Sequence, residues 1–282
     1  MSGMLEVRPG DSAQKRLYVY NRSVLTPERY AELCEIERDW VVRLAAEHEE
    51  RAPRFGFRIE LIDALHDLLA KEEANASDDE RFLAEEATLD QFKTVVAEFA
   101  VDGLVESQSH LGILRRLPSK ARMAVLRVLI DEFGCGNDDM EHSRLYRDLV
   151  TELGLPADLE HYVDRAGDAS FAYVNLFHWL ADRAPAPEYF LGAYAYFEAS
   201  VLYAFKPFAA AAKRLGLRND RYYTEHLYID SFHSKQMQTA IRALGEHREV
   251  DLAKVWAGVT LTSAVIAEAT EAAVDRARTV AA

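Results

Sequence analysis

The sequence predicts an all-α fold in one helical domain, and two observations carry this prediction. The 13 glycines and 8 prolines among the 282 residues fall between long stretches of helical period. No stretch alternates apolar and polar residues over a useful length, and neither an internal repeat nor a flexible linker is visible. The helices are too long and too apolar to be solvent-exposed spacers, so we expect them to pack on one another.

Residues 1–25 are predicted to form an irregular arm, with RLYVYN extended, and residues 26–280 a single helical domain. Thr26 followed by Pro27 is typical of a helix start, so the first helix is predicted from there to about Arg51. Periodic apolar stretches, bounded by glycine, proline or acidic residues, predict the later helices. These are expected at 58–74, 89–112, 118–134, 138–154, 170–182, 187–216, 219–245 and 251–277.

Composition excludes several classes of partner. Lysine and arginine number 33 against 47 aspartates and glutamates, a formal net charge of −14, which argues against a nucleic acid or an anionic membrane. Cys34 and Cys135 form no CxxC motif, so neither a disulfide framework nor an iron–sulfur cluster is expected. The N-terminus lacks an apolar segment, and no apolar run approaches the length of a membrane span. We therefore expect a cytoplasmic protein.

The segment EHLYIDSFHSKQ places His226, Asp230 and His233 a helical turn apart. A helix advances about 100° per residue, so positions i, i+4 and i+7 lie on one face. Their neighbours Leu227 and Phe232 are apolar, so this face is not fully solvated. Buried ionisable groups are costly unless they are paired or bind an ion. The segment therefore predicts either a metal site or a polar network.

Further carboxylates and histidines lie within or beside apolar helices. Glu198 is the only charge in AYAYFEASVLYAF, Glu132 closes MAVLRVLIDEF, and His142 follows the GCGN loop. Glu106 lies in VDGLVESQSH, four residues before His110. Alone, Glu106 would be read as one more acidic residue on an amphipathic helix. His110 could be a metal ligand or a residue that hydrogen-bonds to one, but we expect it to be neither.

Carboxylate and imidazole ligands without sulfur suit iron or manganese, and zinc less specifically. The ferritin-like pattern of two Glu-x-x-His pairs on separate core helices is absent from the sequence. A single histidine on an apolar face is usually a core residue bonded to a backbone carbonyl. Three candidate ligands on one face, together with the inward carboxylates, favour the metal interpretation.

Three segments carry a resemblance to a known family: DEFGCGNDDMEHSRLYRDLVTELGL, YFEASVLYAFKPFAAAAKRLGL and YYTEHLYIDSFHSKQM. Over about residues 85–245 the sequence resembles the heme-oxygenase-like diiron oxidases. The resemblance implies a heme-oxygenase-like seven-helix bundle, here with additional N-terminal helices, and a non-heme diiron site. The metal ligands that it implies are Glu106, Glu132, His142, Glu198, His226, Asp230 and His233.

Within that family, Glu106 and the long interval from Glu132 to His142 resemble the branch that installs N–O bonds in the streptozotocin and azomycin pathways. The branch implies two iron ions, dioxygen as co-substrate, and electrons from a reductase or a small reductant. The substrate that it implies is a small guanidine or amino-heterocycle, such as 2-aminoimidazole. Its nitrogen would be oxidised to an N-hydroxy or nitro product in natural-product biosynthesis. No cupin-like domain follows in the sequence, so a C–N rearrangement is not expected. A homodimer is expected, since the first two helices could pack outside the bundle.

The charges agree with such a site. Glu106, Glu132, Glu198 and Asp230 carry four negative charges when ionised, and two ferrous ions carry four positive charges. The cluster is then near neutral, which a site poor in water can tolerate.

Two alternatives remain open at this stage. A diiron oxidase that cleaves a C–C bond of a fatty or amino acid would need a cation near the metals to hold a carboxylate, and Arg144 and Lys206 are the candidates. A metal-free bundle that binds a small molecule, or acts like a thiaminase, would depend on Cys135. We expect Cys135 to be a small buried residue, since nothing around it is basic enough to form a thiolate. An acidic pocket would suit a cationic guanidinium, but the sequence does not locate one.

Overall fold

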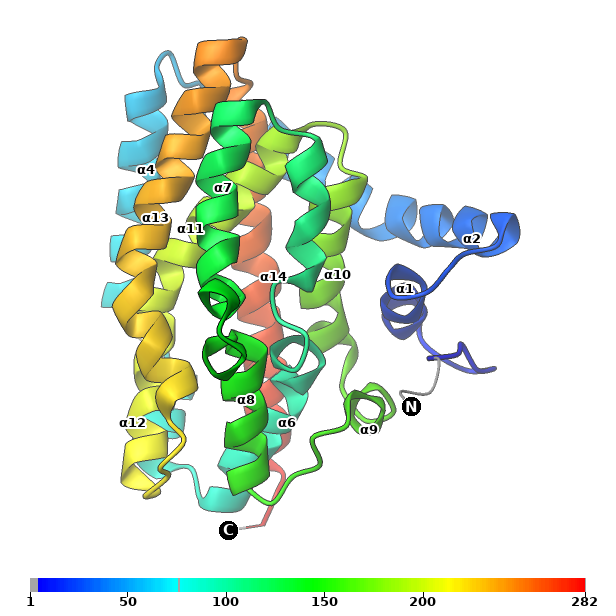
Figure 1. The fold of residues 1–282 in the computed structure, drawn as a ribbon, viewed down its shortest axis with the longest axis vertical. Coiled ribbons are helices and arrows are strands. Elements are labelled where there is room, and N and C mark those ends of the chain that lie inside the picture. The colour runs from blue at the N-terminus through cyan, green and yellow to red at the C-terminus, as the bar shows by residue number, and fades with distance from the viewer. Residues whose placement is uncertain (1–4, 76, 282) are drawn as a thin grey trace.

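A computed structural model describes residues 5–75 and 77–281 of the chain, and its elements are helices joined by turns (Figure 1). Within these residues the only β pairing is one isolated bridge between Phe133 and Glu141. The all-α prediction is therefore confirmed. The main helices are α1 (Ala13–Asn21), α2 (Pro27–Glu37), α3 (Arg43–Glu50), α4 (Arg58–Ala74), α5 (Asp78–Arg81), α6 (Leu89–Gly103), α7 (Ser119–Glu132), α8 (His142–Glu152), α9 (Leu159–Val163), α10 (Asp168–Asp182), α11 (Pro187–Ala204), α12 (Lys206–Arg214), α13 (Arg221–His247) and α14 (Leu252–Arg278).

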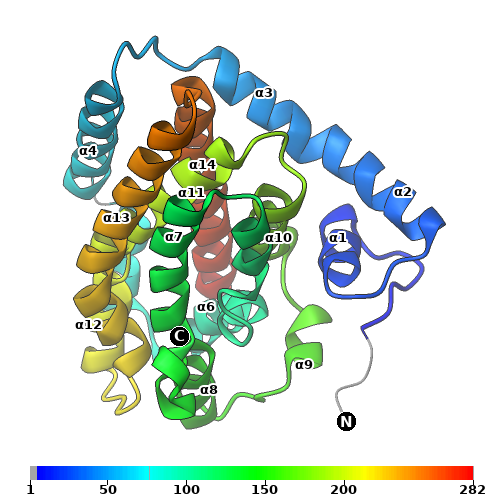
Figure 2. The same ribbon diagram turned by 45° about the horizontal axis from the view of Figure 1, so that its top comes forward.

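The bundle is built around two long helices, α11 and α14, which pack on each other more extensively than any other pair. α13 and α7 extend the bundle on one side of α11, and α10 and α6 pack on α14. Figure 2 shows α2 and α3 running as one arm across an end of the bundle, with α1 beside α10. The predicted helix from Thr26 to about Arg51 matches α2, a π-helical segment η1 (Arg38–Val42) and α3.

The N-terminal arm is less irregular than predicted, because residues 13–21 form α1. Ser12 caps this helix by accepting a hydrogen bond from the Lys15 amide. Leu17 and Tyr18 are buried, and the Tyr18 hydroxyl donates to the Val101 carbonyl at 2.7 Å. The aromatic and β-branched residues of RLYVYN suggested an extended segment, but packing against the bundle overrides that preference.

Two predicted helices end earlier than expected. The helix predicted over 89–112 stops at Gly103, and a 3-10 helix, η3 (Gln108–Arg115), follows a short turn. Leu104 caps the end of α6, and Ser107 adopts a left-handed backbone conformation, with φ of 62°, just before η3. The stretch 187–216 divides into α11 and α12 at Phe205, just before Pro207. Glu106 therefore lies in a turn and not on a helix face.

By length and composition alone α14 could cross a membrane, and it is the one such helix in the described part of the chain. It packs against α11, α6 and α10 as a central helix of the bundle. At the crossing of α11 and α14, an added Cβ on Gly192 would lie 1.8 Å from the Val255 carbonyl oxygen, and one on Gly258 would lie 2.0 Å from that of Tyr189. The two backbones can approach this closely only because both positions are glycine.

Gly192→Ala is therefore expected to destabilise the fold. The new methyl group would meet backbone rather than a movable side chain, so we expect the free energy of unfolding to fall by about 1–3 kcal/mol. Gly245→Ala is the matched control, since its Cβ would meet nothing closer than Val250 Cγ2 at 3.6 Å. The control should be neutral or slightly stabilising. Urea unfolding followed by circular dichroism measures both, and equal effects would contradict the packing argument.

Candidate metal centre

Six of the seven predicted ligands converge at the middle of the bundle from five separate segments. Glu132 is the last residue of α7, His142 the first of α8, and Glu198 lies on α11. His226 and His233 lie on α13, and Glu106 in the turn after α6. All six side chains are buried. Among the described residues they form two groups whose ligand atoms lie within 4.8 Å of one another: Glu106, Glu132, His142 and His226 in the first, and Glu132, Glu198 and His233 in the second.

Glu132 belongs to both groups, and its two carboxylate oxygens face different histidines. Oε2 lies 3.0 Å from His142 Nδ1, and Oε1 lies 3.5 Å from His233 Nδ1. Burial alone would raise the pKa of Glu132, but His142, His226 and His233 outweigh burial and hold the pKa well below its usual range. Ser107 Oγ also donates to Oε2 at 3.0 Å. The carboxylate is thus kept ionised between the two groups, as a bridging ligand would be.

In the first group, the hydrogen bonds of His226 determine which nitrogen can bind a cation. Its Nδ1 lies 2.6 Å from the Tyr222 carbonyl oxygen, which can only accept, so Nδ1 carries the proton. Its Nε2 faces Glu106 Oε1 at 3.1 Å. A neutral imidazole would then set a lone pair against a carboxylate. That contact needs a positive charge between the two atoms, which a proton or a metal ion supplies.

In the second group, His233 Nδ1 lies 3.0 Å from Glu198 Oε2. Its other nitrogen, Nε2, lies 3.4 Å from Asp131 Oδ2. A carboxylate behind the distal nitrogen of a histidine is a frequent partner of metal-bound imidazole, because it orients the ring and raises its basicity. Asp131 was not identified from the sequence, although its position directly before Glu132 was the available signal.

Asp230 cannot be placed in this geometry. Its backbone lies on α13 between His226 and His233, but its side chain falls outside the described part of the structure. Its role as a ligand stays a prediction.

The loop between Glu132 and His142 is built on residues with left-handed backbone conformation. Gly134 and Gly136 have φ of 66° and 82°, and Cys135 has φ of 53°. A Cβ on Gly134 would lie 2.6 Å from the Glu141 backbone nitrogen, so the close return of the chain requires glycine there. This return brings the end of α7 and the start of α8 to the same point.

Cys135 differs from our expectation, because it is exposed and not buried. Its Sγ donates to Asp131 Oδ1 at 3.0 Å. That hydrogen bond, followed by burial and the negative charge of Asp131, raises the pKa of the thiol. The surroundings therefore disfavour the thiolate that a nucleophilic cysteine needs.

His110 packs as an aromatic residue outside both groups. Its ring stacks on Phe177 with centroids 4.4 Å apart and lies 4.6 Å from the Tyr194 ring. Burial lowers its pKa to about 4, so the imidazole is neutral at pH 7.

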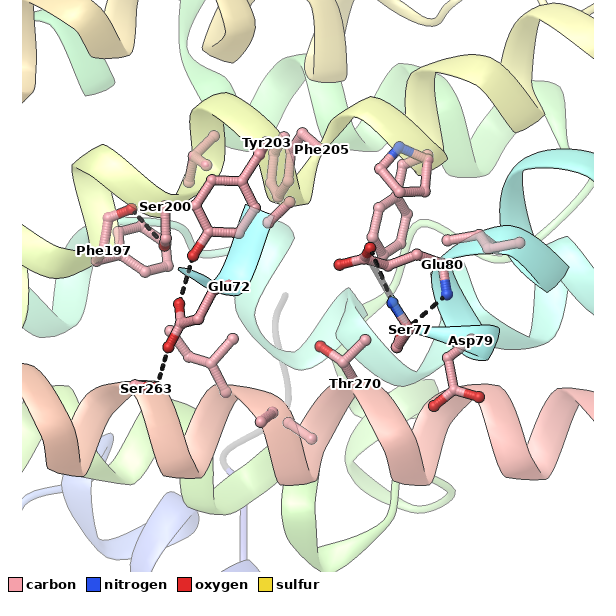
Figure 3. Close-up of a pocket in the computed structure, with 18 of the residues that line it drawn as sticks. Glu72, Ser77, Asp79, Glu80, Phe197, Ser200, Tyr203, Phe205, Ser263 and Thr270 are labelled. Carbon is pink, nitrogen blue, oxygen red and sulfur yellow. Dashed lines mark hydrogen bonds between the residues drawn. The ribbon is translucent and has the colours of Figure 1, made fainter. Parts of the chain in front are cut away.

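A cavity of about 700 Å³ lies beside the first group. Figure 3 shows part of its lining. Tyr222 and Phe205 line it, and their rings lie 4.8 and 5.0 Å from the His226 ring. Asp102 lines it as well, close enough to Glu106 for the two charges to interact. Neither Arg144 nor Lys206 lines this cavity; they pair instead with Asp148 and Glu73.

The sequence analysis missed the acidic character of this cavity. Asp102 lies in an apolar stretch one turn before Glu106, and that spacing was the signal available. Glu72 lies near the end of α4, next to Glu73 in KEEANASDDER, where it resembled part of a solvated connection. The sequence alone does not place Asp102 or Glu72 beside the cavity, because their positions depend on how α4, α6, α11 and α14 pack.

The chain is similar to known proteins over the region that carries these residues. A family model described as iron-containing redox enzyme matches residues 93–266, a range that includes every predicted ligand. Nitrosourea synthase from Streptomyces achromogenes subsp. streptozoticus is 29% identical to the chain over 153 residues, which are 52% of this chain and 31% of that protein. The match thus spans less than a third of that relative. Together these findings confirm the resemblance to heme-oxygenase-like oxidases and the helical bundle that it implied.

Asp131→Asn is expected to weaken metal binding without unfolding the protein. The amide removes the negative charge behind His233, and loss of such a partner typically costs 10–100-fold in metal affinity. Anaerobic Fe(II) titration measures the change. Asp148→Asn, which removes an exposed carboxylate paired with Arg144, should leave the affinity unaltered. Equal affinities in both variants would show that Asp131 does not support the site.

Proposed function

The chain belongs to the iron-containing redox enzyme family, and from this premise we propose that it is a non-heme diiron N-oxygenase. The proposed reaction uses dioxygen to oxidise the amine nitrogen of a small guanidine or amino-heterocycle to an N-hydroxy or nitro product. The observation that carries the proposal is the position of Glu132, which contributes one oxygen to each of two buried carboxylate–histidine groups.

Each group supplies only oxygen and imidazole-nitrogen ligands, the donor set that suits redox iron. Glu106, His142 and His226 would hold one iron ion, Glu198, His233 and Asp230 the other, and Glu132 would bridge them. Iron would supply the electron-transfer chemistry that activates dioxygen, with the balance of electrons from an external reductant or a reductase. The chain's own contribution is to orient the ligands and to surround the site with aromatic side chains that limit access of water.

The choice of an amine substrate rests on the cavity. Its lining includes five carboxylates, from Glu72, Asp79, Glu80, Asp102 and Glu271. The only cation in the described lining is Lys71, which is exposed. A fatty or amino acid held by its carboxylate would need a cation beside the metals, and the two candidates for that role point elsewhere. A relative named for making a nitrosourea, a compound with an oxidised nitrogen, agrees with chemistry at nitrogen. A cytoplasmic homodimer acting in natural-product biosynthesis completes the proposal.

Anaerobic titration of the apoprotein with Fe(II) tests the metal site. We expect saturation near two irons per chain and a transient visible absorption band after rapid mixing with oxygen. Glu132→Ala should lower the stoichiometry to one iron or fewer and abolish the band, because both groups lose a ligand. Glu246→Ala, at an exposed carboxylate paired with Lys120, is the control and should behave as wild type. Saturation at two irons in Glu132→Ala would rule out the bridging role.

The substrate class is tested by the compounds that accelerate decay of that band. Guanidines and amino-heterocycles should accelerate it and yield N-oxygenated products detectable by mass spectrometry. Acceleration by fatty or amino acids alone, with loss of a one-carbon fragment, would replace N-oxygenation by C–C cleavage.

Cys135→Ser separates the diiron proposal from a thiaminase-like reaction. Since the thiol is exposed and its pKa is raised, the variant should retain wild-type iron stoichiometry and turnover. A variant that binds two irons but has lost all turnover would mean that Cys135 takes part in the chemistry.

A further inference from the structure

Buried carboxylates elsewhere in this protein have arginine partners. Arg183 donates to Glu37, Arg276 to Glu98, and Arg248 makes two hydrogen bonds to Glu188. Each of these pairs joins two helices or a helix and the segment beside it. They show how the fold compensates a buried negative charge where the role is structural.

Glu72 lies in the wall of the cavity and lacks such a partner. Its Oε2 accepts a hydrogen bond from the Tyr203 hydroxyl at 2.5 Å, and its Oε1 accepts one from Ser263 at 2.7 Å (Figure 3). Oε2 also accepts one from the Tyr196 hydroxyl at 2.8 Å. All three donors are neutral, and burial raises the pKa of both tyrosines, so they remain protonated. No lysine or arginine in the described chain pairs with Glu72. Its charge is held in place by hydroxyls but is not neutralised.

Asp102 is the second carboxylate of the cavity without a contact ion pair in the described chain. Burial, followed by the nearby charge of Glu106, raises its pKa to about 8, whereas the Tyr173 hydroxyl favours its ionised form. Arg22 lowers the pKa only as a distant charge and forms no ion pair with Asp102. At pH 7 most of Asp102 is therefore protonated, and a cation bound beside it would favour the ionised carboxylate. Asp102 lines the cavity close to Glu106 of the first ligand group.

The other acidic groups of the lining are already engaged. Asp79 pairs with Arg278, and Glu80 closes the capping box at the start of α5 with Ser77. Glu271 is exposed to solvent. Glu72 and Asp102 are thus the two half-buried acidic groups of this lining that have neither an ion pair nor a capping role in the described chain.

The lining that contains these two carboxyl groups also includes several aromatic side chains. Tyr173, Phe197, Tyr203 and Phe205 all line the cavity. Aromatic faces attract alkylammonium and guanidinium groups, and they also cover an apolar chain between two charged ends. A cavity of about 700 Å³ accommodates an extended molecule and not only a single small ring.

We propose that the cavity binds an elongated dication, with one cationic nitrogen at Asp102 beside the metal groups and a second in the hydroxyl-supported site of Glu72. The chemical class is a diamine or an aminoalkyl guanidine without a carboxylate. This inference deepens the proposed function and rests on it for the position of the metals. The ligand nitrogen at Asp102 is the one that lies toward the proposed metal site. Glu72 favours ligands that carry a second cationic group at the other end.

The test is calorimetric titration of the iron-loaded protein, free of oxygen, with α,ω-diamines of increasing length and with n-alkylamines of the same lengths. Diamines should bind at least about tenfold more tightly than the matched monoamines, with a maximum at one chain length, because a charged hydrogen bond is gained only when both sites are reached. Equal affinity of diamines and monoamines at every length would overturn the proposal. This comparison uses the wild-type protein and needs no variant.

Glu72→Gln assigns the second site, because it removes the charge but keeps an acceptor for the hydroxyls. It should lower diamine affinity by about tenfold and leave monoamine affinity unchanged. Glu73→Gln is the matched control on the same helix; Glu73 pairs with Lys206 and does not line the cavity. A Glu72→Gln variant with a lower melting temperature but unaltered diamine affinity would make Glu72 a structural residue and refute the assignment.

Iron binding is recorded in the same samples, which keeps the two proposals distinguishable. Tight diamine binding with no iron uptake would overturn the diiron function and leave the cavity assignment standing. Two bound irons without preference for diamines would support the diiron function and overturn the cavity assignment.

Discussion

The burial of Glu132 between three histidines is the interaction on which the rest of the site depends. Its carboxylate is ionised, lies away from solvent, and faces His142 with one oxygen and His233 with the other. An ionised carboxylate is costly to bury unless positive charge surrounds it. Histidines that also face Glu106 and Glu198 cannot compensate all of these carboxylates while they remain neutral. Protons or metal ions must therefore supply positive charge at the point where these five segments of the chain meet.

The backbone features of the fold serve that convergence. Gly134 lets the chain return so closely after α7 that Glu132 and His142 face each other across a short loop. In the turn after α6, Ser107 adopts a left-handed backbone conformation, and its side chain donates a hydrogen bond to Glu132. The glycine crossing of α11 and α14 brings together the helices that carry Glu198 and one wall of the cavity. The residues with left-handed backbone and the close glycine contacts thus help to fix the positions of the ligand side chains. Such support is expected where the surroundings hold a functional site in one geometry.

The sequence predicted what depends on local spacing and missed what depends on packing. The positions of His226 and His233 follow from helical periodicity, and the core helices follow from their apolar patterns. Glu106 was identified through a family motif, but its place in a turn was not, because helical periodicity continues past Gly103. α1 was missed because its aromatic residues favour a strand by local preference. The packing of Tyr18 against the bundle outweighs that preference. The cavity draws its lining from helices distant in sequence, so no single segment carries its signature.

The distribution of arginine distinguishes two uses of buried acid in this protein. Where a carboxylate ties helices together, as at Glu37, Glu98 and Glu188, the chain supplies an arginine of its own. At the ligand groups, and at Glu72 in the cavity wall, the described chain supplies histidine or hydroxyl instead, whereas Asp79 of the same wall pairs with Arg278. A protein with 47 acidic residues and 33 basic ones has no excess of cations to place there. On the proposed function, metal ions would supply positive charge at the ligand groups, and a cationic substrate would supply it at Glu72.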